Sequence, residues 1–455
     1  MRRIHSKAAI LSVGDELTLG QTLDTNSQWI SRQLLDLGIL PCEHVTVPDV
    51  LESQVSAFKR LAQTYDLVIC SGGLGPTADD LTRAALAQAL SVGLEEDPIA
   101  LAQIEAFYVA RGREMPAINR VQALRPSSAV TMSNLNGTAP GIAATFANGC
   151  DVFCVPGPPV ELHSMFQHQV LPRLRPPAGH TVVTRCVNCI GIGESNLATM
   201  LGEMMSRDRN PLVGTTASGG VVSCRIRYEG AQSQDVAERL VADAEAEVRL
   251  RAGVHAFSTG TESLESAVLQ KLGKLRAKCA TVESCTGGLV SKLLTDVPGS
   301  SSTFIGGLIT YSNEMKTTFA DVDSALFAKE APGAVSHEVA AAMAAGGLKK
   351  LGADLCVSVT GIAGPGGAVP SIGDRPGKPV GLVFIGIALS DSLSTALGVP
   401  ALQTRAFKHI NDRVQVREWS AKSALAAMWF TLNGRADVRL LREIDWPPVA
   451  VVKSS

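Results

Sequence analysis

The fold is decided by residues 66–90, DLVICSGGLGPTADDLTRAALAQAL. This stretch begins with a short apolar run, passes through a glycine-rich turn and continues with helix-forming residues. A short apolar run bounded by glycine is typical of a buried parallel strand, and a helix after the turn is typical of layered α/β folds. Ligands of such folds bind where the strands end. The stretch therefore predicts an α/β domain with a ligand site at turn 71–80.

The same alternation extends in both directions from this turn. The pattern predicts these elements: strand 7–14, helix 22–37, strand 39–47 and helix 50–64 before it, and strand 151–159 and helix 160–171 after it. Strands that alternate with helices predict a sheet covered by helices on both faces. We therefore expect a three-layer α/β domain over residues 1–172.

Two further domains follow. A Pro-rich segment at 173–180 is a linker signal. Strands and a long helix at 231–252 predict a small α+β domain over 181–255. The α/β alternation then returns, with a closing helix at 411–432, and predicts an α/β domain over 262–435. The Gly/Pro-rich stretch 366–379 predicts an exposed loop.

Composition narrows the functional classes. The chain has 455 residues, 4% aromatic residues and a net charge of -2. A near-neutral, aromatic-poor chain argues against a nucleic-acid binder, so nucleic acid is not an expected partner. No apolar stretch reaches the roughly 18 residues of a membrane span, and the N-terminus lacks a secretory pattern. Ten cysteines lie scattered, several in apolar runs. We expect a reduced, cytoplasmic protein without a membrane partner.

Three strand ends in the first domain carry candidate ligand residues. The predicted nucleotide site contains Gly14, Asn26, Gly72, Gly73, Gly75, Thr77, Asp79, Pro156 and Gly157. Glycines let a backbone approach a ligand, and a helix N-terminus attracts phosphate. Acids beside a phosphate site suggest a divalent metal ion, for which Asp15 and Asp80 are the candidates. The alternative is a plain glycine turn with loop acids that favour the helix dipole.

The third domain carries a different set of polar turns. They are ESCTGG (283–288), PGSSS (298–302), TYSNEMK (310–316) and VTGIAGPGG (359–367). A serine nucleophile needs a base, and no histidine triad is evident, which leaves Lys316 as base and Tyr311 as a second proton carrier. The amides of Gly287 and Gly288 are candidates for holding an oxyanion or a phosphate, and Arg413 for gripping a phosphate. The alternatives are serine helix caps, a solvated lysine and an exposed arginine.

Taken together, these motifs resemble the CinA-like (competence/damage-inducible) family over nearly the whole chain. The first domain resembles molybdopterin-binding folds through GDELTLGQTLDTNSQWIS, SGGLGPTADDLTR and PGPPVEL. The segment GIGESNLA resembles a KH-type domain. The motifs VESCTGG, DVPGSSSTFIGG, TYSNEMK, GAVSHEVA, VTGIAGPGG and KPVG resemble the family's C-terminal amidase domain.

The resemblance implies two activities. The C-terminal domain is expected to hydrolyse the carboxamide of nicotinamide mononucleotide to nicotinate mononucleotide and ammonia, in pyridine-nucleotide recycling, without a cofactor. The N-terminal domain is expected to act as a metal-dependent ADP-ribose pyrophosphatase. The residues carried over from the family are Ser284, Ser301, Tyr311, Lys316, Thr360 and Arg413. A homodimer is expected by analogy.

The expected amidase mechanism assigns a role to each of these residues. Ser301 attacks the amide carbon, Lys316 takes its proton and Tyr311 helps return a proton to ammonia. Ser284, with the amides of Gly287 and Gly288, holds the oxyanion, although Ser284 is also a rival nucleophile. Ribose or phosphate is expected at Thr360, at the 361–367 glycines (Gly361 and Gly364 among them) and at Arg413.

Two alternatives stay open at this point. In the first, the chain is mainly a pyrophosphatase that acts on ADP-ribose or on a pterin nucleotide, and its amidase site is idle. In the second, the chain is a non-enzymatic partner in DNA uptake. Two segments also depart from the family pattern. The loop AVPSIGDRPGKPVG is longer and more charged than usual, and FKHINDR replaces F-x-G-D-R.

Overall fold

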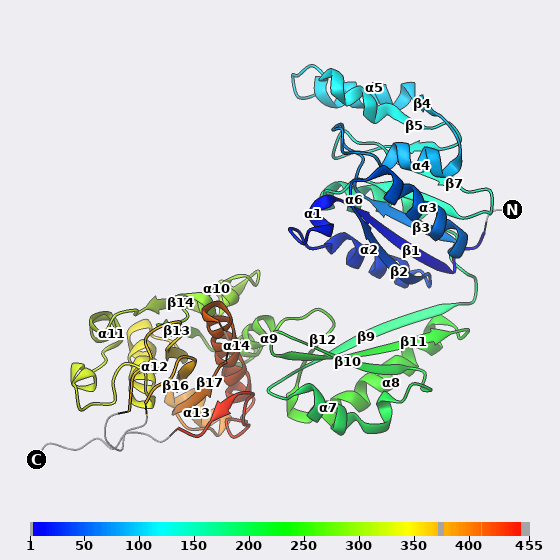
Figure 1. The fold of residues 1–455 in the computed structure, drawn as a ribbon. Helices are drawn as coiled ribbons and strands as arrows, with labels where there is room; N and C mark the ends of the chain where they lie inside the picture. Colours follow the sequence, from blue (N-terminus) through cyan, green and yellow to red (C-terminus); the bar gives the residue numbers. More distant parts are fainter. Residues whose placement is uncertain (1–2, 372–376, 411, 447–455) are drawn as a thin grey trace, which may run out of the picture. The chain divides into compact units, whose positions relative to one another are not determined.

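The structure is a computed structural model that describes residues 3–371, 377–410 and 412–446. The chain divides into two compact units (Figure 1). One contains residues 1–183 and 228–239, and the other contains residues 184–227 and 240–455. Part of the predicted 366–379 loop, residues 372–376, lies outside the described residues.

A six-stranded sheet forms the centre of the N-terminal part, in the order β2-β1-β3-β8-β7-β6. Its strands are β1 (Lys7–Val13), β2 (Leu40–Val47), β3 (Leu67–Ser71), β6 (Val130–Met132), β7 (Gly141–Thr145) and β8 (Asp151–Val155). The first four strands in that order are parallel, whereas β7 and β6 are antiparallel additions. The parallel strands therefore end at a common edge.

Helices cover both faces of this sheet. On one face lie α3 (Leu51–Thr64) and α4 (Thr82–Leu90), and on the other lie α2 (Thr25–Asp36) and α6 (Pro159–Met165). The short helix α1 (Asp15–Thr18) follows β1, and α5 (Pro98–Val109) packs apart from the sheet. Alternate side chains of β1 face opposite ways. Leu11 packs with Phe58 of α3 and Leu86 of α4, whereas Ile10 packs with Leu34 of α2 and Phe166. The predicted three-layer arrangement is confirmed.

Residues 91–150 contain elements that the sequence pattern does not predict. They include helix α5 and a two-stranded sheet of β4 (Leu94–Glu96) and β5 (Leu124–Pro126), besides β6 and β7. These strands are only three to five residues long. Such short strands carry too few residues for a periodic pattern to be evident.

Residues 181–259 contribute a four-stranded sheet in the order β10-β11-β9-β12. Its elements are β9 (Thr181–Ile190), α7 (Glu194–Leu201), β10 (Leu212–Ser218), β11 (Val221–Gly230), α8 (Gln234–Ala252) and β12 (Ala256–Thr259). The β10–β11 and β9–β12 pairs are antiparallel. Two helices beside a small antiparallel sheet are the α+β arrangement that the sequence predicts.

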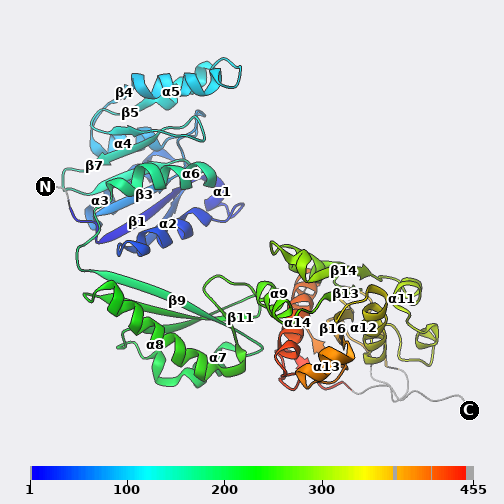
Figure 2. The ribbon, with the colours of Figure 1, turned by 180° about the vertical axis from the view of Figure 1, so that it is seen from behind.

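The C-terminal part is built on a second six-stranded sheet, ordered β14-β13-β15-β16-β17-β18. Its strands are β13 (Cys279–Glu283), β14 (Phe304–Ile309), β15 (Leu355–Gly361), β16 (Leu382–Leu389), β17 (Leu402–Lys408) and β18 (Glu443–Ile444). The strands β14, β13 and β15 are parallel, and the others are antiparallel additions. Helix α9 and helix α14 lie on one face, and α11 and α12 lie on the other (Figures 1 and 2).

The helices of this part are α9 (Leu264–Leu275), α10 (Leu289–Thr295), α11 (Asn313–Ala320), α12 (His337–Leu351), α13 (Asp391–Leu397) and α14 (Arg413–Leu432). Helix α11 ends at Ala320, because Asp321 adopts a left-handed conformation with a φ of 51°. That conformation ends a helix.

A buried ion-pair cluster ties both ends of the N-terminal domain to its sheet. The Asp151 carboxylate, at the start of β8, contacts His5 Nε2 at 3.2 Å and accepts hydrogen bonds from Arg175 Nη2 at 2.5 Å and Thr145 Oγ1 at 2.7 Å. Burial alone raises the pKa of Asp151, but these hydrogen bonds outweigh it and lower the pKa to about 2. The cluster therefore joins the first and last segments of the domain, through His5 and Arg175, to the start of β8.

We predict that Asp151→Ala destabilises the N-terminal domain by about 3 kcal/mol at pH 7, because it leaves Arg175 and His5 without their buried partner. Asp151 adds stability above its unfolded pKa near 4, and that contribution is lost as the pH falls toward 2. Hydrogen exchange of β1 and β8 measures the effect. The exposed Arg60→Ala change is the control. Unchanged exchange in Asp151→Ala would contradict the assignment.

Candidate functional site

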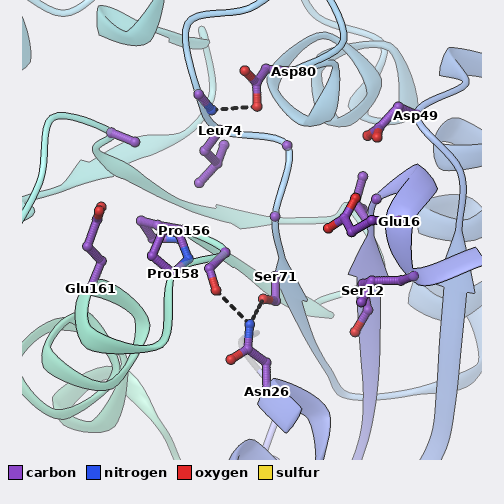
Figure 3. A pocket seen from close by; sticks show the side chains of 18 of the residues that line it. Ser12, Glu16, Asn26, Asp49, Ser71, Leu74, Asp80, Pro156, Pro158 and Glu161 are labelled. Carbon is purple, nitrogen blue, oxygen red and sulfur yellow. Dashed lines mark hydrogen bonds between the residues drawn. The ribbon is translucent and has the colours of Figure 1, made fainter. Parts of the chain in front are cut away.

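The N-terminal domain has a cavity of about 480 Å³ at the common edge where its parallel strands end. Loops that follow β1, β3 and β8 converge on it, as Figure 3 shows. The lining contains all nine predicted nucleotide-site residues: Gly14, Asn26, Gly72, Gly73, Gly75, Thr77, Asp79, Pro156 and Gly157. Strand direction thus brings together residues from three distant segments of the chain.

Asn26 connects these loops from the start of α2. Its Nδ2 donates to Ser71 Oγ at 3.0 Å and to the Gly157 carbonyl at 2.8 Å, whereas its buried Oδ1 has no hydrogen-bond partner (Figure 3). Gly72 approaches β1 so closely that a Cβ would lie 2.4 Å from the Val13 carbonyl oxygen. The glycine at this position is therefore a packing requirement.

Two charged side chains hold the glycine-rich turn. The Asp80 carboxylate accepts from the Gly75 N–H at 2.7 Å and from the N–H and hydroxyl of Thr77 at 2.8 and 2.5 Å. The buried Arg83 guanidinium donates to the carbonyls of Leu74 and Gly75. Burial lowers the pKa of Arg83 to about 10. Sequence reasoning missed Arg83, although an arginine amid the apolar residues of helix 82–90 is a visible signal.

The predicted metal pair does not fit a cation. The Asp80 carboxylate is engaged by the turn, and Asp15 does not line the cavity but accepts from the Asp49 N–H at 3.1 Å. Within residues 3–371, 377–410 and 412–446, no group of three or more His, Cys, Asp or Glu side chains is arranged to hold a metal ion. Asp15 and Asp80 therefore serve as acceptors for backbone N–H groups.

A second cavity, of about 290 Å³, lies where β13, β14 and β15 end. Seven predicted residues line it: Ser284, Tyr311, Lys316, Thr360, Gly361, Gly364 and Arg413. Thr360 is buried and donates to the Ala334 carbonyl at 2.7 Å, so its hydroxyl fixes the cavity wall. The acid-rich N-terminal cavity and this one each lie within a single unit.

Lys316 is the buried amine of this second cavity, with only 2% of its surface exposed. Its Nζ lies 3.1 Å from Ser284 Oγ, 3.0 Å from the Thr310 carbonyl oxygen and 3.3 Å from the Tyr311 carbonyl oxygen. Carbonyl oxygens only accept, so two N–H groups of a neutral amine point to them and its lone pair is left for the Ser284 hydroxyl. Burial lowers the pKa of Lys316 to about 8.

Ser284 stands on a sharp turn between β13 and α10. Its N–H donates to the Val359 carbonyl at 2.9 Å, which fixes the turn against β15. Cys285 is the next side chain in the cavity, but burial raises the pKa of its thiol to about 12. A protonated thiol is a poor nucleophile. Ser284 is therefore the nucleophile candidate that has a base within reach.

Ser301 lies at the other end of the sheet from Lys316. It sits in the short helical turn Ser300–Ser302 that precedes β14, whereas Ser284 follows β13, and these two strands are parallel. A strand of five or six residues separates the two ends by roughly 17–20 Å. The expected Ser301–Lys316 dyad within one chain is therefore wrong.

The amides of Gly287 and Gly288 are also unavailable for an oxyanion. The Gly287 N–H donates to the Ser284 carbonyl at 3.1 Å, and the Gly288 N–H donates to the Glu283 carboxylate at 2.9 Å. Glu283 is completely buried and also accepts from the N–H groups of Val290 and Ser291. The expectation fails because the Ser284 carbonyl and the Glu283 carboxylate already accept these two N–H groups. Sequence reasoning missed Glu283, which caps the start of α10.

Arg413 forms the polar lip of the cavity. Its Nη1 donates to the Gly364 carbonyl at 2.7 Å and its Nη2 donates to the Tyr311 hydroxyl at 3.1 Å. It is also the first residue of the 20-residue helix α14. A guanidinium at a helix N-terminus is suited to an anionic group such as a phosphate. The residue before Asp412, in the altered FKHINDR segment, lies outside the described residues.

Comparisons with known proteins agree with this architecture. Three family models match, described as “Probable molybdopterin binding domain” over residues 9–176, “Damage-inducible protein CinA KH domain” over 184–258 and “CinA C-terminal domain” over 261–432. A CinA-like protein of Synechococcus sp. (strain RCC307) is 42% identical over 86% of this chain and 92% of its own length.

Further relatives cover similar or smaller shares. A CinA-like protein of Trichodesmium erythraeum is 38% identical over 92% of this chain and 95% of its own. The crystal structure of the protein CinA from Thermoplasma acidophilum is 32% identical, with a TM-score of 0.35, and matches 37% of this chain and 97% of that one. No helix in the described part of the chain has the length and hydropathy of a membrane span. The chain belongs to the CinA family, with a molybdopterin-binding-like N-terminal domain and a KH-type middle domain.

Proposed function

We propose that the C-terminal domain is an amidohydrolase with Ser284 as nucleophile and Lys316 as general base. The observation that carries this proposal is the contact of 3.1 Å between Lys316 Nζ and Ser284 Oγ, with two carbonyl oxygens occupying the other N–H directions of the amine. A pKa near 8 lets the amine accept a proton at neutral pH and return it in the next step.

The reaction proceeds in two halves. Ser284 Oγ attacks the amide carbon while its proton moves to Lys316 Nζ. The carbon–nitrogen bond then breaks, Lys316 returns the proton to the departing nitrogen, and ammonia leaves an ester on Ser284. A water molecule, deprotonated by Lys316, attacks the ester carbon. The bond to Ser284 Oγ then breaks, Lys316 returns the proton to Oγ, and the acid leaves and ionises to the carboxylate. The N–H of Cys285, next to the nucleophile, is the candidate donor to the oxyanion.

The substrate we propose is nicotinamide mononucleotide. Its carboxamide would enter toward Ser284, and its phosphate would meet Arg413 at the cavity lip. A free amide at one end and a dianionic phosphate at the other correspond to the two polar ends of this cavity. Tyr311 reaches Lys316 through its main-chain carbonyl, whereas its hydroxyl binds Arg413. We therefore assign Tyr311 to substrate placement.

The decisive experiment is ammonia release from nicotinamide mononucleotide by the full-length protein, with and without EDTA. Release that survives EDTA and is lost in Ser284→Ala supports the proposal. The same release in Ser284→Ala as in the wild type would refute the assignment of the nucleophile.

A second candidate function belongs to the N-terminal cavity: hydrolysis of a nucleotide pyrophosphate such as ADP-ribose. The convergence of three strand-end loops on one cavity favours it. Release of AMP from ADP-ribose that is lost in Asn26→Ala would support it. The alternative of a role in DNA uptake would instead show as a salt-sensitive gel shift with single-stranded DNA.

Removing the base tests the Lys316 assignment. We predict that Lys316→Met lowers kcat by about 10²–10⁴-fold, the usual contribution of a general base. Lys316→Arg should be equally inactive, because a guanidinium keeps the charge but cannot accept a proton at neutral pH. Lys292→Met, on the exposed side of α10, is the matched control. Steady-state kinetics on nicotinamide mononucleotide gives the result, and an active Lys316→Arg protein would contradict the role.

The pH profile tests the same residue without a substitution. Only the neutral amine can act as base, so activity should rise about tenfold per pH unit below pH 8 and level off above it. The measurement is kcat/KM for nicotinamide mononucleotide between pH 6.5 and 9.5. A profile that is flat across this range would show that Lys316 does not limit the rate.

A further inference from the structure

Helix α14 carries a second arginine, and its side chain contacts the nucleophile turn (residues 284–287). Arg417 lies one helical turn after Arg413 and is partly buried. Its Nε donates to the Cys285 carbonyl at 3.2 Å, and its Nη2 donates to the Thr286 carbonyl at 2.7 Å. The guanidinium therefore spans the backbone directly after Ser284.

These contacts fix the direction of the N–H that is the candidate oxyanion donor. The carbonyl of the peptide group between Ser284 and Cys285 accepts from the Gly287 N–H at 3.1 Å. Because a trans peptide group is planar, the Cys285 N–H points away from that carbonyl. A donor stabilises an oxyanion best when it is held in place before the reaction. Arg417 holds the next peptide group and so keeps the Cys285 N–H from turning.

The middle domain packs against α14, within the same compact unit. The Phe257 ring meets the Trp429 ring edge-on at 6.2 Å, and the His255 ring meets the Phe430 ring at 5.9 Å. Gly191 approaches the helix so closely that a Cβ would lie 2.8 Å from the Phe430 ring. The C-terminal half of α14 is therefore fixed by direct packing against the middle domain.

The hairpin turn between β10 and β11 reaches the N-terminal half of the same helix. Gly220 has a φ of 84°, and a Cβ there would lie 2.9 Å from the Trp419 ring. This ring has little room to yield, because the Arg442 guanidinium lies 4.1 Å above its centroid and His409 stacks with it at 6.5 Å. Gly219 also has a positive φ, of 56°, but a Cβ there would meet nothing within 4 Å. Only Gly220 is therefore required for the contact with α14.

We propose that Arg417 is a positioning residue of the amidase and that the middle domain holds the helix that carries it. Arg417 and Trp419 are two residues apart, so their side chains leave α14 about 200° apart, in nearly opposite directions. The helix is thus held between the nucleophile turn and the hairpin turn. A displacement of the hairpin turn moves the guanidinium and, with it, the Cys285 N–H. This assignment rests on the proposed amidase function.

Removing the guanidinium tests the role of Arg417. Arg417→Ala should lower kcat for nicotinamide mononucleotide by about 10–100-fold with little change in KM, because the proposed phosphate contact of Arg413 stays in place. Methylguanidinium at millimolar concentration, or Arg417→Lys, should restore part of the activity, since each supplies N–H donors for the two carbonyls. A misfolded protein would not respond to methylguanidinium. Wild-type kcat in Arg417→Ala, or a loss that neither change restores, would overturn the positioning role.

The two neighbouring glycines test the role of the middle domain. Gly219→Ala and Gly220→Ala both place a Cβ on backbone with positive φ, but only Gly220→Ala pushes against Trp419. We expect kcat to fall about fivefold or more in Gly220→Ala and to stay near the wild-type value in Gly219→Ala. Equal kcat in the two variants would overturn the role of the middle domain.

Hydrogen exchange of the full-length protein tests the contact independently of activity. The amides of residues 284–291 should exchange faster in Arg417→Ala and in Gly220→Ala than in the wild type or Gly219→Ala. If this difference is found but the wild type releases no ammonia from nicotinamide mononucleotide, the proposed function fails and the link from the middle domain to the turn stands. Equal exchange in all of these proteins would overturn the proposal.

Discussion

The C-terminal site depends on the burial of one amine. An ammonium that is almost completely removed from water loses most of its hydration, so its charged form is disfavoured and its pKa falls to about 8. The carbonyl oxygens of Thr310 and Tyr311 then orient the amine, because they accept its N–H groups. What remains is a lone pair aimed at Ser284. Without burial, the same lysine would be a fully protonated cation at neutral pH.

Strand direction explains why the two cavities described above lie at corresponding places in their sheets. In both six-stranded sheets a parallel core is extended by antiparallel strands, and the cavity lies where the parallel strands end. Residues at those ends come from segments as distant as Gly14 and Gly157, or Ser284 and Arg413. The sheets thus position chemistry that no local sequence motif contains.

Strand direction also separates the features that could be predicted from the sequence from those that could not. Apolar runs and glycine turns predicted the layers and most strands, and the strand-end rule predicted which loops would meet. The sequence did not predict which of two serines contacts Lys316. Ser284 and Ser301 lie at opposite ends of parallel strands, and a motif does not show at which end of the sheet its serine will lie. Nor did it predict that Asp80 would serve the turn, since a free and an engaged carboxylate look alike in a sequence.

In both glycine-rich turns, charged side chains occupy backbone N–H and C=O groups, and this determines what each turn can bind. In the first, Asp80 occupies backbone N–H groups and Arg83 occupies carbonyls. In the second, Glu283 occupies N–H groups, and Arg417 donates to the carbonyls of Cys285 and Thr286. Buried charges of both signs therefore fix each turn from within. A turn fixed in this way has few amides left for a ligand, so recognition passes to side chains: Asn26 in one cavity, and Ser284, Lys316 and Arg413 in the other.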